Sequence, residues 1–319
     1  MGGMAGVGGA NASAGGAGSG ASGTPAAGGA VATGGSASSG ASGTAGTTGT
    51  SGGAAGQGGS SPSAGASGGG GAGTGGTSAG AAGTSGTAPG CGERALPICE
   101  DFEEVTEGDV PPDWSKNGNV GVASDQFHRG SRSLKVGAAD AGARRMTLMG
   151  ARVAALGGTH WGRVFYKVAQ PAPRPASGVI HSTIVAGSAQ SPVSGTIEVR
   201  VVDTVEDNQG NHQYLYNVQP NGRGEFGRGS TYDYQYDGEW HCTEWFVDHA
   251  TQSYRFFVNG DEIESIAVAN GAGNFSESEI PAVFDSLSVG WNNYQTAPNG
   301  GFVAWLDDLA IAPNRLGCE

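Results

Sequence analysis

The stretch TIEVRVVD (residues 196–203) decides the fold class of this chain. Its apolar residues Ile197, Val199 and Val201 alternate with the charged residues Glu198 and Arg200. Successive side chains of a strand point to opposite faces, so the alternation predicts a strand with one buried face and one face in water. Similar runs recur along the chain with turn residues between them, and helical periodicity is nearly absent.

These runs predict an all-β fold. The other runs are NVGVAS (119–124), SRSLKVG (131–137), RRMTLM (144–149), GRVFYKVA (162–169), GVIHSTIVAG (178–187), QYLYNVQ (213–219), HCTEWFVD (241–248), SYRFFVNGDEIESIAV (253–268), VFDSLSVGW (283–291) and FVAWLDDLAI (302–311). The pair Asn259-Gly260 suits a type I′ hairpin turn, in which both central residues need positive φ. About a dozen antiparallel strands predict two packed sheets, that is, an antiparallel β-sandwich or jelly roll.

Composition divides the chain at residue 90. Residues 1–90 hold no charged residue and no aromatic ring, and consist almost entirely of Gly, Ala, Ser and Thr. Such a segment cannot offset the entropy of ordering its backbone, so we expect a disordered tether followed by one folded domain over residues 91–319. The net charge of −13 then belongs to the domain, which argues against nucleic acid and anionic membranes as partners. No stretch is long and apolar enough to insert in a bilayer, and we expect a monomer.

The four cysteines form an even set without the close pairs of a zinc site. We therefore expect two disulfides and an oxidising compartment. Three pairings are possible, of which we favour Cys91–Cys99 as a local loop and Cys242–Cys318 as a tie for the C-terminal segment. The first residues, MGGMAGVGGA, do not read as a signal peptide, yet the cysteines still favour a secreted or cell-surface protein.

Acidic residues stand beside core residues at both ends of the domain. Glu103 lies in CEDFEEV (99–105), and Asp307 and Asp308 lie in WLDDLAI (305–311). First and last strands of a sandwich are often neighbours, so these carboxylates and carbonyl oxygens of the turn HRGSRS (128–133) would form an all-oxygen cage. Such a cage predicts a structural Ca²⁺ ion. The alternative is a solvated acidic strand end.

The segments CEDFE, HRGSRSLKV, GEWHCTEWFVD, RFFVNGDEIES, FDSLSVGW and WLDDLAI occur in this order between residues 99 and 311. In this order they resemble the polysaccharide-lyase-like jelly-roll family, which includes a fungal cellulose-induced protein and glucuronan lyase, within the concanavalin A-like lectin/glucanase sandwiches. The resemblance implies a calcium site made by the first and last strands, which matches Glu103 with Asp307 or Asp308. It also implies a glycan groove across one sheet, and so polysaccharide as the partner.

A lyase acting on a uronate chain needs a group that neutralises the carboxylate, a base and an acid. The catalytic candidates are His181, Arg200, Tyr214 and Tyr216, and the substrate-binding candidates are Arg163, Gln213 and Tyr294. The IH of GVIHST is similar to the alginate-lyase Q-I/V-H strand, with Val179 in place of Gln. GWNNYQ (290–295) is similar to the G-x-Y-x-Q motif of that family, with its tyrosine one residue out of register.

Each candidate also has a structural interpretation. His181 could be a hydrogen-bonded strand histidine, since the parity of its strand is ambiguous, and Tyr214 and Tyr216 could be core aromatics because they alternate in step with Val218. The tyrosines of STYDYQYDGEW (230–240) could be a sugar-stacking platform or ordinary surface residues.

Three hypotheses follow from the sequence: a glycan-binding module, a polysaccharide lyase acting by β-elimination, and a non-catalytic structural or adhesion protein. The odd separation of Glu198 and Asp203 predicts opposite faces, which argues against a glycosidase pair. Net acidity argues mildly against a polyuronate substrate.

Overall fold

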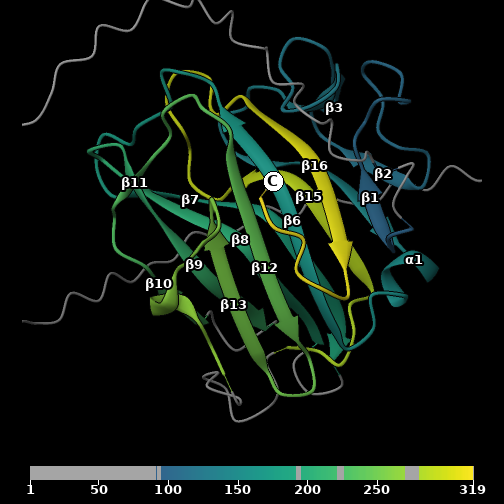
Figure 1. Ribbon diagram of the computed structural model, residues 1–319. Coiled ribbons are helices and arrows are strands. Elements are labelled where there is room, and N and C mark those ends of the chain that lie inside the picture. The colour runs from purple at the N-terminus through teal and green to yellow at the C-terminus, as the bar shows by residue number, and fades with distance from the viewer. Residues whose placement is uncertain (1–90, 92–94, 192–194, 221–225, 270–279, 319) are drawn as a thin grey trace, which may run out of the picture. The chain divides into compact units, whose positions relative to one another are not determined.

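The computed structural model describes residues 91, 95–191, 195–220, 226–269 and 280–318. These residues form two antiparallel sheets of eight strands each, packed face to face (Figure 1). The prediction of an all-β sandwich is therefore confirmed. The predicted tether, residues 1–90, lies outside the described residues.

Sheet A has the strand order β14-β13-β12-β6-β16-β4-β3, and β1 also pairs with β16. Its strands are β1 (Ile98–Glu100), β3 (Val120–Ala123), β4 (Ser133–Val136), β6 (Thr159–Val168), β12 (His241–Asp248), β13 (Ser253–Val258), β14 (Asp261–Glu262) and β16 (Ala304–Ala312). The last strand, β16, thus lies in the middle of this sheet. The β13–β14 turn has positive φ at both Asn259 and Gly260, as the sequence predicts.

Sheet B has the order β10-β9-β8-β7-β15-β5-β2, with β11 paired to β9. Its strands are β2 (Trp114–Asn117), β5 (Gly142–Met149), β7 (Val179–Ser191), β8 (Gly195–Asp207), β9 (Asn211–Pro220), β10 (Phe226–Gly229), β11 (Tyr234–Gln235) and β15 (Ser286–Asn293). Both α1 (Ala151–Ala154) and η2 (Glu264–Ile266) are single helical turns. No helix in the described part of the chain is long and apolar enough to cross a bilayer.

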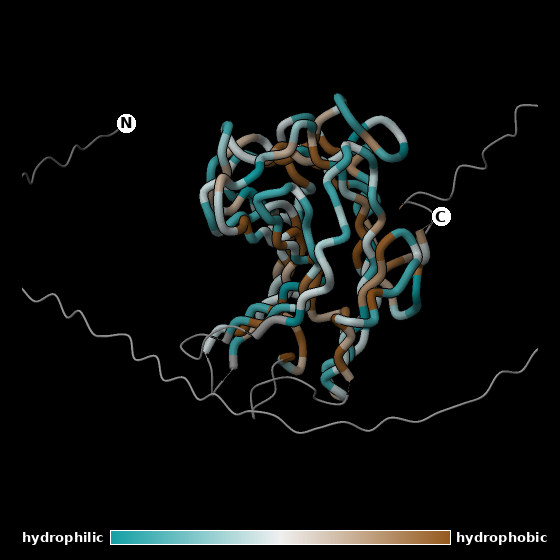
Figure 2. The backbone as a smooth tube through the Cα atoms, turned by 90° about the vertical axis from the view of Figure 1, so that its left-hand side faces the viewer, coloured by the Kyte–Doolittle hydropathy of each residue, from teal (hydrophilic) through white to brown (hydrophobic). Residues whose placement is uncertain are grey.

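The core fills the space between the sheets, and Figure 2 shows hydrophobic segments recurring along the strands of both layers. Tyrosines join the two layers. The hydroxyl groups of Tyr166 on β6 and Tyr214 on β9 are 2.5 Å apart, and the Tyr254 hydroxyl donates to the Val201 carbonyl at 2.9 Å. Buried hydroxyl groups need such partners, so these bonds fix how the sheets are aligned.

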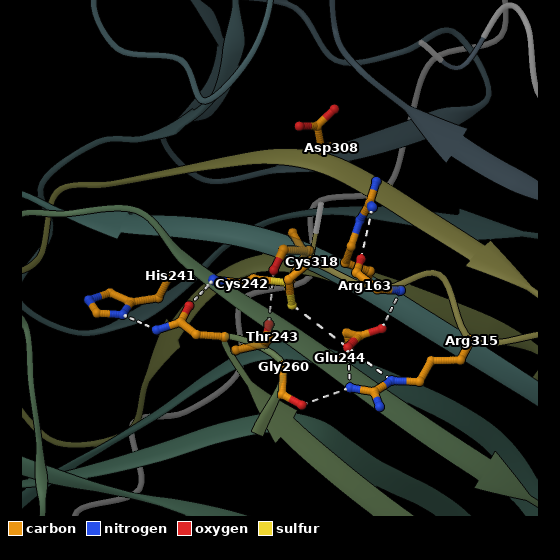
Figure 3. Close-up of a disulfide and its surroundings, with 12 residues drawn as sticks. Arg163, His241, Cys242, Thr243, Glu244, Gly260, Asp308, Arg315 and Cys318 are labelled. Atoms are coloured by element: carbon orange, nitrogen blue, oxygen red, sulfur yellow. Dashed lines mark hydrogen bonds and ion pairs between the residues drawn. A yellow bond between two sulfur atoms is a disulfide. The ribbon is translucent and has the colours of Figure 1, made fainter. Parts of the chain in front are cut away.

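Two disulfides close loops of very different length. Cys91 pairs with Cys99, and Cys242 pairs with Cys318, which are the favoured pairings. Figure 3 shows the second disulfide on sheet A, where Glu244 accepts hydrogen bonds from the Arg315 guanidinium and from the Gly317 N–H. The C-terminal segment is thus held on sheet A by one covalent link and several polar contacts.

Candidate functional site

A polar cluster on the outer face of sheet B is the candidate functional site, and β-bulges create it. The pairing of β7 with β8 shifts register around Val185, and the pairing of β8 with β9 shifts between Arg200 and Asp203. Each shift places an extra residue in one strand and changes which side chains face outward. As a result Asp203 faces the same side as Arg200, although the odd separation of these two residues on β8 would otherwise place them on opposite faces. His181, on the neighbouring strand β7, faces this side as well.

Four side chains in this cluster form a hydrogen-bonded chain. His181 Nε2 lies 2.6 Å from Asp203 Oδ2, and the Thr183 hydroxyl donates to Asp203 Oδ1 at 2.6 Å. The Tyr294 hydroxyl lies 3.1 Å from Thr183 Oγ1. With Nε2 directed at Asp203, the Nδ1 atom of neutral His181 is the acceptor nitrogen.

Backbone contacts join the two motifs similar to alginate lyases. The Tyr294 N–H donates to the His181 carbonyl at 2.9 Å, and the His181 N–H donates to Gln295 Oε1 at 2.7 Å. The ring centroids of His181 and Tyr294 are 5.0 Å apart. The register offset of Tyr294 therefore does not separate it from the histidine.

Arg200 lies beneath Tyr294 and is itself almost fully buried. Its guanidinium carbon is 4.2 Å from the Tyr294 ring centroid, and its Nε donates to Glu198 Oε1 at 2.9 Å. A further bond joins Arg200 to the Gln219 side-chain oxygen. The guanidinium thus packs against one face of the tyrosine ring, and its positive charge is paired with the Glu198 carboxylate.

The protonation states follow from burial and charge. Burial raises the pKa of Tyr294 to about 12, with Glu198 acting in the same direction, so its hydroxyl keeps its proton at neutral pH. Burial also raises the pKa of Asp203, although His181 and Arg200 favour its charged form. Burial lowers the pKa of Arg200, but the nearby Asp203, Tyr294 and Glu198 outweigh this and raise it overall.

The structure brings three of the predicted residues together: His181, Arg200 and Tyr294. Asp203 and Thr183, which join them, were not among the predicted site residues. Asp203 ends an otherwise apolar run, and a carboxylate there needs a buried partner. That signal was available, but the parity argument, which placed Asp203 opposite Glu198, was wrong because of the β8 bulge.

Tyr214 and Tyr216 do not lie on this face, so the prediction that they share a surface with His181 was wrong. Both are fully buried between the sheets. Tyr214 bonds Tyr166 there, and the Tyr216 ring stacks on Tyr254 at 4.5 Å. Their strand buries the face that carries aromatic rings, as strands of a sandwich do.

Of the other two predicted substrate-binding residues, Arg163 lies away from the cluster, whereas Gln213 lies on the same face of sheet B, two strands from His181 in the same cross-strand row. Arg163 is on sheet A, where it donates to the Gly317 carbonyl at 3.0 Å (Figure 3). Gln213 is on sheet B and pairs across from Val205, and its amide donates to the exposed Tyr232 hydroxyl at 3.0 Å. The Arg163 guanidinium is therefore bonded to the C-terminal segment. The Gln213 side chain is bonded to the loop that carries Tyr232.

The tyrosines of residues 230–240 do not form one platform. Tyr236 is buried, with its hydroxyl 2.9 Å from Thr204 Oγ1, whereas Tyr232 is exposed and Tyr234 is half-buried. Alternation along an irregular loop thus did not predict a common face.

The acidic ends of the domain do converge, and they meet at the predicted turn. Glu103 Oε1 accepts from the Ser131 N–H at 2.9 Å and from the Arg132 N–H at 3.0 Å. Asp307 Oδ2 accepts from the His128 N–H at 2.8 Å.

The groups around these carboxylates are not the oxygen ligands of a calcium site. The carboxylates face N–H groups rather than carbonyl oxygens, and the Asp308 carboxylate lies 2.7 Å from His128 Nδ1. No group of three acidic, histidine or cysteine side chains in the described residues is placed to hold a metal ion. Burial and the nearby Asp308 raise the pKa of Asp307 to about 8. These contacts explain the acidic residues as anchors of the turn, and the calcium site stays a prediction.

No family model and no curated protein matches the sequence. Among solved structures, the chain is similar to the cellulose-induced protein Cip1, with 18% identity, a TM-score of 0.45, and coverage of 70% of this chain and 100% of that one. It is also similar to the receptor-binding domain of botulinum neurotoxin mosaic serotype C/D, with 12% identity and a TM-score of 0.42. That match covers 64% of this chain and 43% of the toxin domain.

Proposed function

We propose that the folded domain binds polysaccharide on the outer face of sheet B, with Tyr294 as the contact surface. The observation that supports this most is the setting of that ring: it is 39% exposed, and the buried Arg200 guanidinium lies against it. An aromatic ring held flat at a surface offers a sugar apolar area with polar groups at its edge. His181 and Glu198 supply those polar groups.

An uncharged glycan suits this face better than a polyuronate. The Arg200 guanidinium is already paired with Glu198, and Arg145 Nη1 lies 3.6 Å from the same carboxylate. Binding a uronate there would require breaking such a pair in a domain that is acidic overall. The motif resemblance to polysaccharide-lyase-like proteins supports glycan binding in general.

A second candidate function is β-elimination, favoured by one observation: Asp203 orients His181 beside the protonated Tyr294. In that reaction His181 Nδ1 would accept the C5 proton and the Tyr294 hydroxyl would protonate the departing O4 oxygen. The pairing of the nearby arginines with Glu198 counts against this candidate, since the substrate carboxylate would need its own neutralising group.

We also propose that the protein is exported. The two disulfides support this, since such bonds persist in oxidising compartments.

Retention on insoluble neutral β-glucans tests the binding proposal. We expect Tyr294→Ala to weaken retention about tenfold, the effect of losing one stacked ring, and Tyr294→Phe to retain most of it. Phe127→Ala removes another exposed aromatic ring, outside the cluster, and is the matched control. Equal retention of Tyr294→Ala and the parent would refute the proposal. Absorbance of an unsaturated product on uronate polymers would instead favour the lyase.

A further inference from the structure

A second polar site lies between the two sheets rather than on an outer face. Strands β9 and β11 of sheet B and β12, β13 and β14 of sheet A contribute to a pocket of about 470 Å³, a volume in the range of small-molecule sites. We call it the inter-sheet pocket. Its exposed lining includes Asp233, Gln235 and Asp261, and its buried lining includes His212 and Tyr214.

His212 is the observation that points to a ligand. Its side chain is 1% exposed, and neither ring nitrogen has a hydrogen-bond partner among the described residues. The ring stacks on Tyr236 with centroids 4.2 Å apart, so its orientation is fixed. Burial lowers the pKa of His212 to about 3, so the ring is neutral and offers one donor and one acceptor. Both ring nitrogens are closed to solvent, so a ligand reaches them only where the pocket wall shifts. Buried polar groups in native proteins are normally paired, and such a ligand would supply the partner.

The charge of the pocket indicates the kind of ligand. Asp233, Asp237 and Asp261 line it, and its described lining includes no lysine or arginine. Hydrogen bonds from the Glu239 N–H and from His241 outweigh burial and hold the pKa of Asp237 below its usual range. The pocket is therefore negatively charged at neutral pH. A fourth lining carboxylate, Glu262, is already paired with an arginine outside the pocket.

Tyr234 gives the pocket an aromatic wall. It is half-buried, and its ring lies 4.8 Å from that of Tyr214. Burial raises the pKa of Tyr234, and the charges of Asp233 and Asp261, which line the same pocket, act in the same direction. The amide side chains of Gln235 and Asn259 also line the pocket. Gln235 Nε2 donates to Asn211 and Asn259 Oδ1 accepts from the Cys242 N–H, which leaves Gln235 Oε1 as an acceptor for a hydroxyl group.

We propose that the inter-sheet pocket binds an amino-sugar residue. Its ammonium group would face Asp233 and Asp261, its ring would lie against Tyr234, and one hydroxyl would bond His212. An organic cation fits better than a metal ion, because no three acidic or histidine side chains in the described part of the chain are grouped to hold one. This proposal does not depend on glycan binding at Tyr294, which belongs to a different face.

Titration with glucosamine, glucose and propylamine, followed by NMR of the histidine ring protons in the full chain, tests the proposal. The His212 signals are assigned from their loss in His212→Gln. We expect glucosamine to shift the His212 signals, and to bind about tenfold more tightly than glucose or propylamine, because only glucosamine joins the charge to the hydroxyl groups.

Charge removal at the rim provides the second measurement. The side chain of Asp261 is exposed and makes no hydrogen bond or ion pair among the described residues, while its backbone pairs with Val258, so Asp261→Asn should leave the fold intact and weaken glucosamine binding about tenfold. Asp109→Asn removes one charge from an exposed position before β2 and should leave binding unchanged. Equal binding of glucose and glucosamine, equal binding of propylamine, or no effect of Asp261→Asn would each overturn the proposal. The His212 shift is read separately from retention on β-glucans, so either proposal can fail alone.

Discussion

Removing the Cys242–Cys318 disulfide should destabilise the domain more than removing Cys91–Cys99. The first bond joins residues 76 positions apart and the second joins residues 8 positions apart. The loss of chain entropy in the unfolded state grows with loop length, which gives about 4.5 kcal/mol for the long loop and about 2.5 kcal/mol for the short one. We therefore expect Cys242→Ala/Cys318→Ala to lose about 2 kcal/mol more than Cys91→Ala/Cys99→Ala.

Contacts of the C-terminal segment add to this difference. Without the disulfide, residues 315–317 are held by non-covalent contacts alone, namely the Arg315–Glu244 ion pair and the hydrogen bonds of Gly317 to Glu244 and Arg163, and Glu244 is itself buried. Urea unfolding at equilibrium, followed by tryptophan fluorescence, measures both losses under identical conditions. Amide exchange of residues 314–318 should speed up only in the variant without Cys242–Cys318. Equal losses in the two variants, or a larger loss for the short loop, would refute the reasoning.

Three further predictions concern stability. Burial raises the pKa of Glu206 from 4.5 to about 8. Between these two pH values the folded chain keeps a proton that the unfolded chain releases, so the free energy of unfolding should decrease as the pH rises through this range. Glu206→Gln should remove that part of the fall, and urea unfolding of both proteins at pH 5 and about pH 8.5 measures it. If calcium binds near Glu103, a chelator should lower the melting temperature of the parent, and Glu103→Ala should abolish this sensitivity; an unchanged melting temperature in the parent contradicts the calcium prediction. Deleting residues 1–88 should leave the unfolding transition of the domain unchanged, because a segment without charges or rings has little to bury; a large loss of stability would contradict the tether.

Strand existence could be predicted from the sequence, but strand faces could be predicted only in part. The alternation in β8 correctly assigns Ile197, Val199 and Val201 to the core. It fails at Asp203, because a bulge between Arg200 and Asp203 resets the parity and nothing in the run VRVVD marks its position. The ambiguity at His181 has the same cause, since the irregularity around Val185 sends that valine inward while His181 faces outward.

Three residues of the candidate site were predicted from the sequence, but the hydrogen bonds that join them were not. His181 and Tyr294 are 113 positions apart, and only sheet pairing of β7 with β15 brings them together. Tyr214 was misplaced because alternation fixes which residues share a face without fixing which face is buried. No sequence pattern predicted the inter-sheet pocket, because its lining residues come from five strands and their turns.

The central place of β16 in sheet A limits the order in which this domain can be completed during synthesis. β16 lies between β6 and β4, and its residues 304–312 are translated after all the other strands. A nascent chain halted before residue 304 would hold sheet A as two separate pieces and a lone β1, with the edges of β6 and β4 unpaired. Such edges pair readily with other chains, so the growing polypeptide is exposed to misassembly until its last strand emerges. Cys318 follows β16 in the sequence, so the Cys242–Cys318 bond can form only after β16 has been synthesised. A chain that contains this disulfide is therefore one in which every strand has been translated.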